Sequence, residues 1–365
     1  MTSTLRVLMA GGGSAGHTSP LIATADALRR QSPDCRITAL GTARGLETRV
    51  IPAAGLPLEL VPAVPLPRRL GADLFAAPRR VWSALQATLE VIDRVEPDVV
   101  VGFGGYASVP AYLAARRRRI PIVVHEGNAV PGLANKLGAR LTRWVATSFP
   151  GTPLRNGLYI GLPVRSLISG LDRSAYRAEA RDFFSLREGL PTLLVTGGSQ
   201  GARRLNDSMI GAAASLTTAG IQVLHVVGPN GQVVTGIGSE AVPYRMETYV
   251  DRMDLAYSAV DAVLCRAGSN TVTEVSGLGL PAVYVPLPIG NGEQAHNAAP
   301  VVAAGGGMLV ADDELTPTWV AEQIPRLLGD PARLQAMSLA AQGVVPLDAD
   351  EKLAEMIREA AGGKG

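Results

Sequence analysis

The sequence predicts an α/β protein made of two doubly wound, Rossmann-like units that face each other across a cleft. Three observations support this. Short apolar runs recur along the chain, stretches with helical spacing separate them, and the second half opens with the same strand, glycine turn and helix as the first. Apolar runs without alternation are typical of strands buried on both faces of a parallel sheet. Ligands of such sheets bind beyond the carboxyl ends of the strands, so two facing units would enclose a cleft.

Each unit supplies its own set of strands. Six apolar runs of the first half are predicted to be strands, at residues 5–10, 35–41, 56–62, 98–103, 120–126 and 143–149. Four follow in the second half, at residues 191–197, 222–228, 261–266 and 281–287. The helical stretches between them imply parallel connections.

A cluster of Gly, Pro and Ser, LYIGLPVRSLISG, marks the junction of the two units. We therefore expect an N-terminal domain over residues 1–163 and a C-terminal domain over residues 164–340. The remaining segment, residues 341–365, is expected to contain a helix that packs back on the N-terminal domain.

Composition restricts the class of protein. The 365 residues are 47% hydrophobic and 18% charged, which is typical of globular domains, and they suffice for two domains. A net charge of +2 does not favour nucleic acid as a partner. We expect no signal peptide, because the first apolar run has only the length of a strand. We also expect no membrane-spanning helix, because no apolar stretch reaches about 18 residues. Cys35 and Cys265 are isolated in strand-like runs, so we expect reduced, buried thiols.

The first glycine turn, AGGGSAGH, connects a strand to a helix. Gly11, Gly13 and Gly16 match the G-x-G-x-x-G pattern of dinucleotide-binding proteins, in which backbone N–H groups and a helix N-terminus hold a pyrophosphate. A nicotinamide site also needs an acidic residue at the end of the second strand, and that strand ends in Gly41 and Thr42. The turn is therefore expected either to face another anion or to pack closely, with no nicotinamide cofactor.

Seven motifs in order resemble one family. They are AGGGSAGH, GFGGYASVP, HEGNAVPGLANK, GLPVR, TGGSQGARRLN, CRAGSNTVTE and GEQAHNA, and they extend from residue 10 to residue 298. This set resembles the GT-B glycosyltransferases and, among them, the MurG family. The resemblance implies inverting transfer of N-acetylglucosamine (GlcNAc) from UDP-GlcNAc to undecaprenyl-pyrophosphoryl-MurNAc-pentapeptide, lipid I, which yields lipid II for peptidoglycan.

The second half is expected to bind the donor. The turn after Arg266 precedes a helix whose free N–H groups suit a diphosphate, and Glu274 on that helix can accept the ribose hydroxyls; the alternative is a solvated helix residue. By resemblance, Ser199 and Gln200 bind the pyrophosphate, Val250 offers its backbone to uracil, Gln294 holds a sugar hydroxyl and Asn297 supports that loop. Arg165 is either a further donor contact or part of an interdomain salt bridge. The other implied donor contacts are Ser14, Ala15, Gly16, Asn128, Arg266, Ser269, Asn270, Thr271, Val272 and Thr273.

The first half is expected to bind the acceptor. Tyr106, His125 and Asn128 follow two strands, so they lie at strand carboxyl ends. Inverting transfer needs a base for the acceptor hydroxyl, and His17 is the candidate because imidazole titrates near working pH. Glu126 is the competing candidate. A third possibility is that His17 only hydrogen-bonds phosphate groups.

No metal site is expected. Transferases of the other large fold hold Mg²⁺ or Mn²⁺ with Asp-x-Asp, and the one such triplet here, Asp348-Ala349-Asp350, lies in a C-terminal segment expected to be exposed and distant from every motif. No cofactor is required on this interpretation, although Mg²⁺ bound to the diphosphate could assist.

The segment RRLGADLFAAPRRVW, residues 68–82, predicts contact with a membrane surface. It sets Leu74, Phe75 and Trp82 among Arg79, Arg80 and other arginines, a pattern that suits anionic lipid. The alternative is an ordinary amphipathic helix whose apolar side is buried in the core. The first interpretation predicts a peripheral protein on the cytoplasmic face of the cell membrane.

The expected partners are UDP-GlcNAc, lipid I, the anionic inner-membrane surface and other cell-wall synthesis proteins. Three other functions share these features: a GT-B transferase with another lipid or natural-product acceptor, a UDP-GlcNAc 2-epimerase, and a silent sugar-nucleotide binding subunit. Because the chain carries both halves with both sets of loops, the sequence favours an enzyme with a separate acceptor site.

Overall fold

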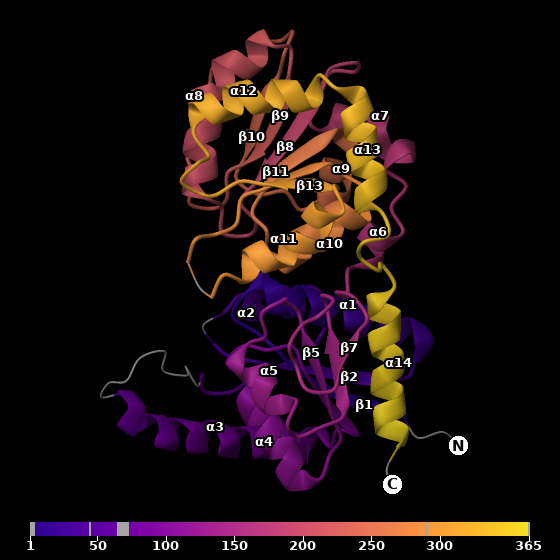
Figure 1. Cartoon of the computed structure of the whole chain (residues 1–365). Helices are drawn as coiled ribbons and strands as arrows, with labels where there is room; N and C mark the ends of the chain where they lie inside the picture. Colours follow the sequence, from indigo (N-terminus) through magenta and orange to yellow (C-terminus); the bar gives the residue numbers. More distant parts are fainter. Residues whose placement is uncertain (1–3, 44, 64–72, 290, 364–365) are drawn as a thin grey trace. The chain divides into compact units, whose positions relative to one another are not determined.

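The computed structural model describes residues 4–43, 45–63, 73–289 and 291–363, with side chains described from residue 80 onward in the third range. The chain forms two compact units (Figure 1). Unit 1 comprises Met1–Arg165 and Pro346–Gly365, and unit 2 comprises Ser166–Val345.

Unit 1 is built on a seven-stranded sheet in which every pair of neighbours is parallel. In spatial order its strands are β3 (Leu58–Leu60), β2 (Arg36–Gly41), β1 (Arg6–Ala10), β4 (Val99–Gly102), β5 (Ile122–Glu126), β6 (Trp144–Thr147) and β7 (Gly157–Tyr159). The chain runs outward from β1 to β3 and then returns to β4 on the other side of β1. The order therefore reverses between β1 and β4, and ligands of open α/β sheets bind at such a point.

Both faces of this sheet are covered, as the continuous apolar strands predict. The described helices of unit 1 are α1 (Ala15–Gln31), α2 (Glu47–Ala53), α3 (Asp73–Val95), α4 (Ser108–Arg118), α5 (Leu133–Gly138) and α14 (Ala349–Gly362). Alternate strand residues point to opposite sides. Val7 and Met9 pack in one core with residues of α1 and α14, whereas Leu8 and Ala10 pack in another with residues of α3 and α4.

Helix α14 belongs to unit 1 although it follows all of unit 2 in the sequence (Figure 1). Leu353 and Ile357 are fully buried in the core that also holds Leu21 and Leu28 of α1. Arg30 of α1 donates to Asp350 at 2.7 Å, and that carboxylate is nearly fully buried. Apolar packing and a partly buried ion pair therefore hold α14 against α1.

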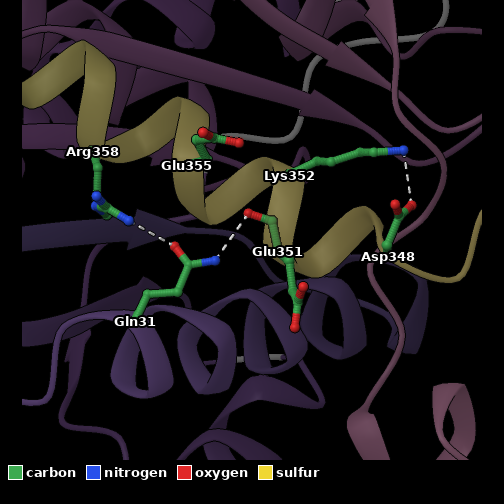
Figure 2. Close-up of a pocket in the computed structure, with 6 residues that line it drawn as sticks. All are labelled: Gln31, Asp348, Glu351, Lys352, Glu355 and Arg358. Carbon is green, nitrogen blue, oxygen red and sulfur yellow. Dashed lines mark hydrogen bonds and ion pairs between the residues drawn. The ribbon is translucent and has the colours of Figure 1, made fainter.

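A polar pocket lies where α14 meets the last residue of α1, Gln31 (Figure 2). The Gln31 amide donates to the backbone carbonyl of Glu351 and accepts from Arg358, and Lys352 pairs with Asp348 at 2.9 Å. The pocket sits at the end of α1 opposite the glycine turn, so it is not the predicted site.

Unit 2 repeats the same plan with a six-stranded parallel sheet. In spatial order its strands are β10 (Tyr244–Glu247), β9 (Gln222–Val226), β8 (Thr192–Thr196), β11 (Ala262–Cys265), β12 (Ala282–Tyr284) and β13 (Gly307–Leu309). Its described helices are α6 (Ser166–Ser169), α7 (Arg173–Phe183), α8 (Arg203–Thr218), α9 (Met253–Ala259), α10 (Ser269–Gly277), α11 (Glu293–Ala303), α12 (Pro317–Leu328) and α13 (Pro331–Ala341). The strand order reverses between β8 and β11.

The prediction of two doubly wound α/β units is confirmed, and all ten predicted strands are present. The sequence missed β7, β10 and β13, which have three or four residues each and form sheet edges. Edge strands are partly exposed, so they lack the continuous apolar run that identified the others. Across the described residues, the helices are either too short or too polar to traverse a lipid bilayer.

Candidate active site

Two glycine turns meet at the reversal point of unit 1, one after β1 and one after β4. A Cβ added at Gly105, where φ is +81°, would lie 2.4 Å from the carbonyl oxygen of Gly12. A Cβ at Gly104, where φ is +94°, would lie 3.0 Å from Nε2 of His17. Both positions thus need glycine for its conformation and its small size. The sequence left close packing open as one explanation of the first glycine turn. The structure shows such packing between the turns after β1 and β4.

A hydrogen bond to the turn after β1 holds His17 in one tautomer. Its Nδ1 lies 2.9 Å from the carbonyl oxygen of Gly12 and 3.3 Å from Oγ of Ser14. Because a carbonyl oxygen can only accept, the neutral ring carries its proton on Nδ1 and its lone pair on Nε2. His17 is partly exposed in the first turn of α1. It therefore has the tautomer and the exposure that a general base requires.

Glu47, which the sequence analysis did not single out, anchors the same turn from α2. Its side chain is fully buried, its Oε2 accepts from the N–H of Gly13 at 2.8 Å, and its Oε1 accepts from the N–H and Oγ1 of Thr42 at 3.0 and 2.9 Å. Burial alone would raise the pKa of Glu47, but these hydrogen bonds outweigh it and lower the pKa. The second strand itself ends without the acidic residue that a nicotinamide site needs. Glu47 lies five residues beyond Thr42, and its carboxylate binds N–H groups of the protein's own backbone.

Glu126 is committed to the loop that follows β5. Its Oε1 accepts from the N–H of Asn128 at 2.9 Å, and its Oε2 accepts from the N–H of Gly132 at 2.9 Å and from the side-chain amide of Asn135 at 3.0 Å. The side chain is 3% exposed. Tyr112, itself fully buried, donates to Asn135 at 2.7 Å. These bonds suit Glu126 to ordering the loop and leave His17 as the better placed base.

The three predicted acceptor contacts differ in exposure. Tyr106 is 46% exposed and Asn128 is partly exposed, so both present their side chains at the strand ends. His125 is interior, with Nε2 3.0 Å from Oγ of Ser148, and burial lowers its pKa to about 3. His125 is therefore neutral and buried, packs beneath the protein surface, and does not reach solvent in this structure.

In unit 2 the turn after β8 has the same construction. A Cβ at Gly201, where φ is +73°, would lie 2.4 Å from the carbonyl oxygen of Val227 at the end of β9. Ser199 and Gln200 form the exposed part of the turn. Both side chains therefore stand at the reversal point of this sheet, where a pyrophosphate would approach.

Arg266 lies inside unit 2 and joins three loops. Its Nη1 contacts Asp312 at 2.6 Å and donates to the carbonyls of Val285 and Pro286 at 3.1 and 3.2 Å. Because the side chain is 8% exposed and its charge is paired, it acts as a structural support for the loops that follow β11, β12 and β13.

Few side chains at the start of α10 are exposed. Ser269, Val272 and Thr273 are buried, and the latter two are fully so. Asn270 and Thr271 are partly exposed. The predicted diphosphate contact at this helix end is therefore available to backbone N–H groups and to two side chains at most.

Glu274 is partly exposed on α10 and is oriented by a second residue that the sequence did not reveal. Tyr257 of α9 donates its hydroxyl to Oε2 of Glu274 at 2.8 Å. Burial raises the pKa of Tyr257, and the neighbouring Glu274 raises it further, so the phenol remains a donor at neutral pH. The carboxylate is thereby fixed as an acceptor of hydrogen bonds.

Gln294 connects the loops that follow β11 and β12. Its Oε1 accepts from the N–H of Ala267 at 3.2 Å and from the N–H of Leu287 at 2.9 Å. The amide oxygen is thus used by the protein, and the NH₂ end is the one suited to donate to a sugar hydroxyl. Asn297, fully buried on α11, donates to the carbonyl of Ala267 at 3.3 Å and so supports the same loop.

The remaining predicted donor contacts have simple surroundings. Ser14 is exposed, and Ala15 and Gly16 are partly exposed in the first turn of α1. Val250 follows β10 with its side chain 9% exposed, so only its backbone could serve a ligand. Arg165 is exposed, and it is the last residue of the segment Met1–Arg165 of unit 1.

The Asp-x-Asp triplet is used for packing. Asp350 was expected to be exposed, and this was wrong, because Arg30 pairs with it beneath α14. Asp348 pairs with Lys352 on the helix surface. In the described ranges, no three His, Cys, Asp or Glu side chains converge in a way that could hold a metal ion.

The segment predicted to contact a membrane lies partly outside the described residues. The side chains of Leu74, Phe75 and Arg79 are among those not described. In the first half of α3, Arg80 is exposed and Trp82 is 59% exposed, whereas Ala84 is buried. The alternative of a fully buried apolar side therefore does not hold at Trp82.

Two family models match most of the chain, and similar proteins match nearly all of it. The glycosyltransferase family 28 N-terminal domain matches residues 7–147, and the C-terminal domain of that family matches residues 192–356. A protein of Nocardioides sp. is 61% identical over 97% of this chain and 98% of its own length. A protein of Streptomyces coelicolor is 55% identical over 98% of each.

Both are named UDP-N-acetylglucosamine–N-acetylmuramyl-(pentapeptide) pyrophosphoryl-undecaprenol N-acetylglucosamine transferase. Among solved structures, the crystal structure of Acinetobacter baumannii MurG superposes with a TM-score of 0.76. It is 28% identical in sequence and covers 97% of this chain and 99% of its own.

Proposed function

Since the chain belongs to glycosyltransferase family 28, we propose that it transfers GlcNAc from UDP-GlcNAc to lipid I, undecaprenyl-pyrophosphoryl-MurNAc-pentapeptide, with inversion at the anomeric carbon. The product is lipid II for peptidoglycan. The two named relatives support this function because they share more than half of their residues with this chain over almost its full length. An epimerase, a silent binding subunit or a transferase with another acceptor has no comparable support.

The observation that carries the mechanism is the hydrogen bond between Nδ1 of His17 and the carbonyl of Gly12. It leaves Nε2 able to take the proton of the acceptor hydroxyl. As this proton departs, the hydroxyl oxygen forms a bond to the anomeric carbon of GlcNAc, and the bond from that carbon to the UDP oxygen breaks. UDP leaves as an anion, and the proton remains on the His17 imidazolium.

Unit 2 is proposed to hold the donor through three kinds of contact. Glu274 accepts the ribose hydroxyls, Gln294 donates to a hydroxyl of the sugar, and the turn with Ser199 and Gln200 faces the diphosphate. The backbone of α10 and of Val250 completes the contacts to phosphate and uracil. Fixed N–H donors stabilise the charge that develops on the leaving diphosphate. Arg165 is proposed as a further donor contact.

The reaction is proposed to need no metal held by the protein, although Mg²⁺ bound to the diphosphate could assist. Turnover that persists in EDTA would agree with this. Turnover that vanishes in EDTA and returns with added Mg²⁺ would assign that role to the ion.

The protein is further proposed to act as a peripheral protein on the anionic cytoplasmic face of the cell membrane, beside other cell-wall synthesis proteins. Exposed Trp82 and Arg80 support this placement, since an aromatic ring among arginines suits the lipid headgroup region. A polyprenyl-anchored acceptor would reach unit 1 from such a surface.

The central experiment incubates the purified protein with labelled UDP-GlcNAc and a lipid I analogue, and compares wild type with His17→Asn and His17→Gln. The Asn amide can replace the Nδ1 donor, and the Gln amide can replace a hydrogen bond from Nε2, but neither can take a proton. A loss of turnover of about a hundredfold in both variants is expected for a base. Substantial activity in His17→Gln would reduce His17 to a hydrogen-bonding role.

A further inference from the structure

A single peptide unit joins the buried carboxylate of Glu47 to the ring of His17. The carbonyl oxygen of the Gly12–Gly13 peptide lies 2.9 Å from Nδ1 of His17. The N–H of the same peptide donates to Oε2 of Glu47 at 2.8 Å. Since the C=O and N–H of one peptide point in opposite directions, the two side chains lie at its two ends.

We propose that Glu47 is a positioning residue that acts on His17 through the Gly12–Gly13 peptide. Its negative charge polarises this peptide, strengthens the carbonyl as an acceptor for Nδ1–H, and so keeps the lone pair on Nε2. The arrangement performs the task of a carboxylate bound directly to a catalytic imidazole, with a peptide inserted between them. The inference rests on the proposed function in one respect, the use of His17 as the base.

The surroundings of Glu47 keep it charged and in place. Three donors converge on its oxygens: the N–H of Gly13, the N–H of Thr42 and the hydroxyl of Thr42. Hydrogen bonds to a carboxylate are strong and favour its ionised form. The group is also inaccessible to solvent, so it cannot itself bind a ribose or a phosphate.

The glycines around Glu47 fix its position further. A Cβ added at Gly12 would lie 2.4 Å from Oε1 of Glu47, one at Gly41 would lie 2.7 Å from Cγ, and one at Gly45 would overlap the carboxylate. The turn after β1, the end of β2 and the segment before α2 thus surround Glu47 with glycine at these three positions. Gly12, Gly41 and Gly45 thus share one purpose, which is to leave room for the Glu47 side chain.

Other titratable groups near His17 are either neutral or bound elsewhere. His125 of β5 is buried, and its pKa of about 3 keeps it neutral. Glu126, also of β5, is occupied by Asn128, Gly132 and Asn135. Tyr112 of α4 donates to Asn135, and burial raises its pKa. Among the described residues, Glu47 is therefore the charged group in contact with the peptide that holds His17.

The test is nitrogen-15 NMR of the full chain labelled at histidine. The chain has four histidines, and burial lowers the pKa values of His125 and His225 to about 3 and 4. The other two histidines are His17 and His296, and His296→Asn distinguishes their signals. Wild-type His17 should show the Nδ1–H tautomer. In Glu47→Gln the Nε2–H tautomer should gain population, and the His17 pKa should fall by about half a pH unit or more.

Thr42→Val is the matched control, because it removes one hydrogen bond to the same carboxylate but keeps the charge. It should lower the melting temperature and leave the His17 tautomer unchanged. In kinetics, Glu47→Gln should lower kcat by about tenfold, shift the acid limb of kcat/KM to lower pH, and leave KM for UDP-GlcNAc within about twofold.

Either of two results would overturn the inference: wild-type His17 in the Nε2–H form, or a Glu47→Gln tautomer and pKa equal to those of wild type. The wild-type spectrum decides the first point even if Glu47→Gln does not fold. Because the NMR measurement needs no turnover, it is separate from the proposed function. Loss of activity in the His17 variants with no NMR response to Glu47→Gln would refute the role of Glu47 alone.

Discussion

The hydroxyl of Tyr257 donates to Oε2 of Glu274 at 2.8 Å and connects α9 to α10. Tyr257 is buried and Glu274 is partly exposed. The phenol therefore sets the direction in which the carboxylate presents its acceptor oxygens. If Glu274 binds the ribose as proposed, recognition of the donor depends on a residue that does not itself face the ligand.

Glu274→Ala should raise KM for UDP-GlcNAc by about 10- to 100-fold, because hydrogen bonds to a charged group contribute about 1.5 to 3 kcal/mol. Tyr257→Phe keeps the carboxylate but frees its orientation, so a smaller rise of about threefold is expected. Steady-state kinetics with a lipid I analogue, together with the melting temperature, measures both. An unchanged KM in Glu274→Ala would remove the ribose contact from this residue.

Gln294→Glu should separate the two roles of Gln294. The new side chain can still accept from Ala267 and Leu287, but it has lost the NH₂ donor. We expect kcat/KM for UDP-GlcNAc to fall by about tenfold or more with little change in the melting temperature. Gln294→Ala, which loses both roles, should lower the activity and the melting temperature together. Equal activity of Gln294→Glu and wild type would show that the sugar is held elsewhere.

Binding to vesicles tests the membrane surface. The protein should sediment with vesicles that contain anionic phospholipid, and binding should fall with salt because each basic side chain adds about 1 kcal/mol. Trp82→Ser, and Phe75→Ser in the undescribed part of the segment, should each reduce binding about fivefold or more. Phe183→Ser on α7, where a ring 60% exposed is removed from unit 2, is the matched control. If wild type ignores anionic vesicles at low salt, the lipid-facing role is refuted.

The buried histidines predict how stability depends on pH. The pKa values of His125 and His225 are lowered by burial to about 3 and 4, below the value of about 6.5 for an unfolded chain. The unfolded state therefore binds protons first, and the stabilisation present above about pH 6.5 is lost as the pH falls.

Each histidine should cost its unit about 2 kcal/mol of unfolding free energy between pH 6.5 and 5. Thermal or urea unfolding at a series of pH values measures this loss. In His225→Gln, the unit 2 transition should be less sensitive to pH over this range. A flat profile between pH 6.5 and 5 in wild type would contradict the neutral, buried state of both rings.

Leu353→Ala should destabilise unit 1 by about 2 to 5 kcal/mol, because the side chain is fully buried against α1 and the change leaves a cavity. Leu339→Ala, on α13 in unit 2, is the control, since that side chain is 65% exposed. Calorimetry that resolves the two units should show a shift of the unit 1 transition only. A shift confined to unit 2 would contradict the assignment of α14 to unit 1.

Strand positions and the two-unit plan could be predicted because continuous apolar runs report burial on both faces directly. The start of the glycine turn at Gly11 and the place of His17 at its exit followed from the same pattern. Edge strands such as β10 could not be found this way, because YRME alternates between buried and exposed residues.

The sequence could not predict which groups the side chains of the site would bind. Glu126 and Arg266 stand at strand ends, where polar residues usually serve ligands, yet both are used inside the protein. A residue type at a strand end does not tell which backbone donors or counter-charges the following loop will bring to it. Glu47 was missed for the converse reason, because an acid at the start of a short helix gives no sign that a glycine turn will fold over it.

The return of α14 to unit 1 has a consequence for synthesis on the ribosome. The α1 face with Leu21 and Leu28 emerges early, but its covering residues Leu353 and Ile357 emerge only after the whole of unit 2. A nascent chain halted before Ala349 should therefore carry an uncovered apolar face and recruit chaperones, while unit 2 can already fold. The first unit to be translated is in this way the last to be completed.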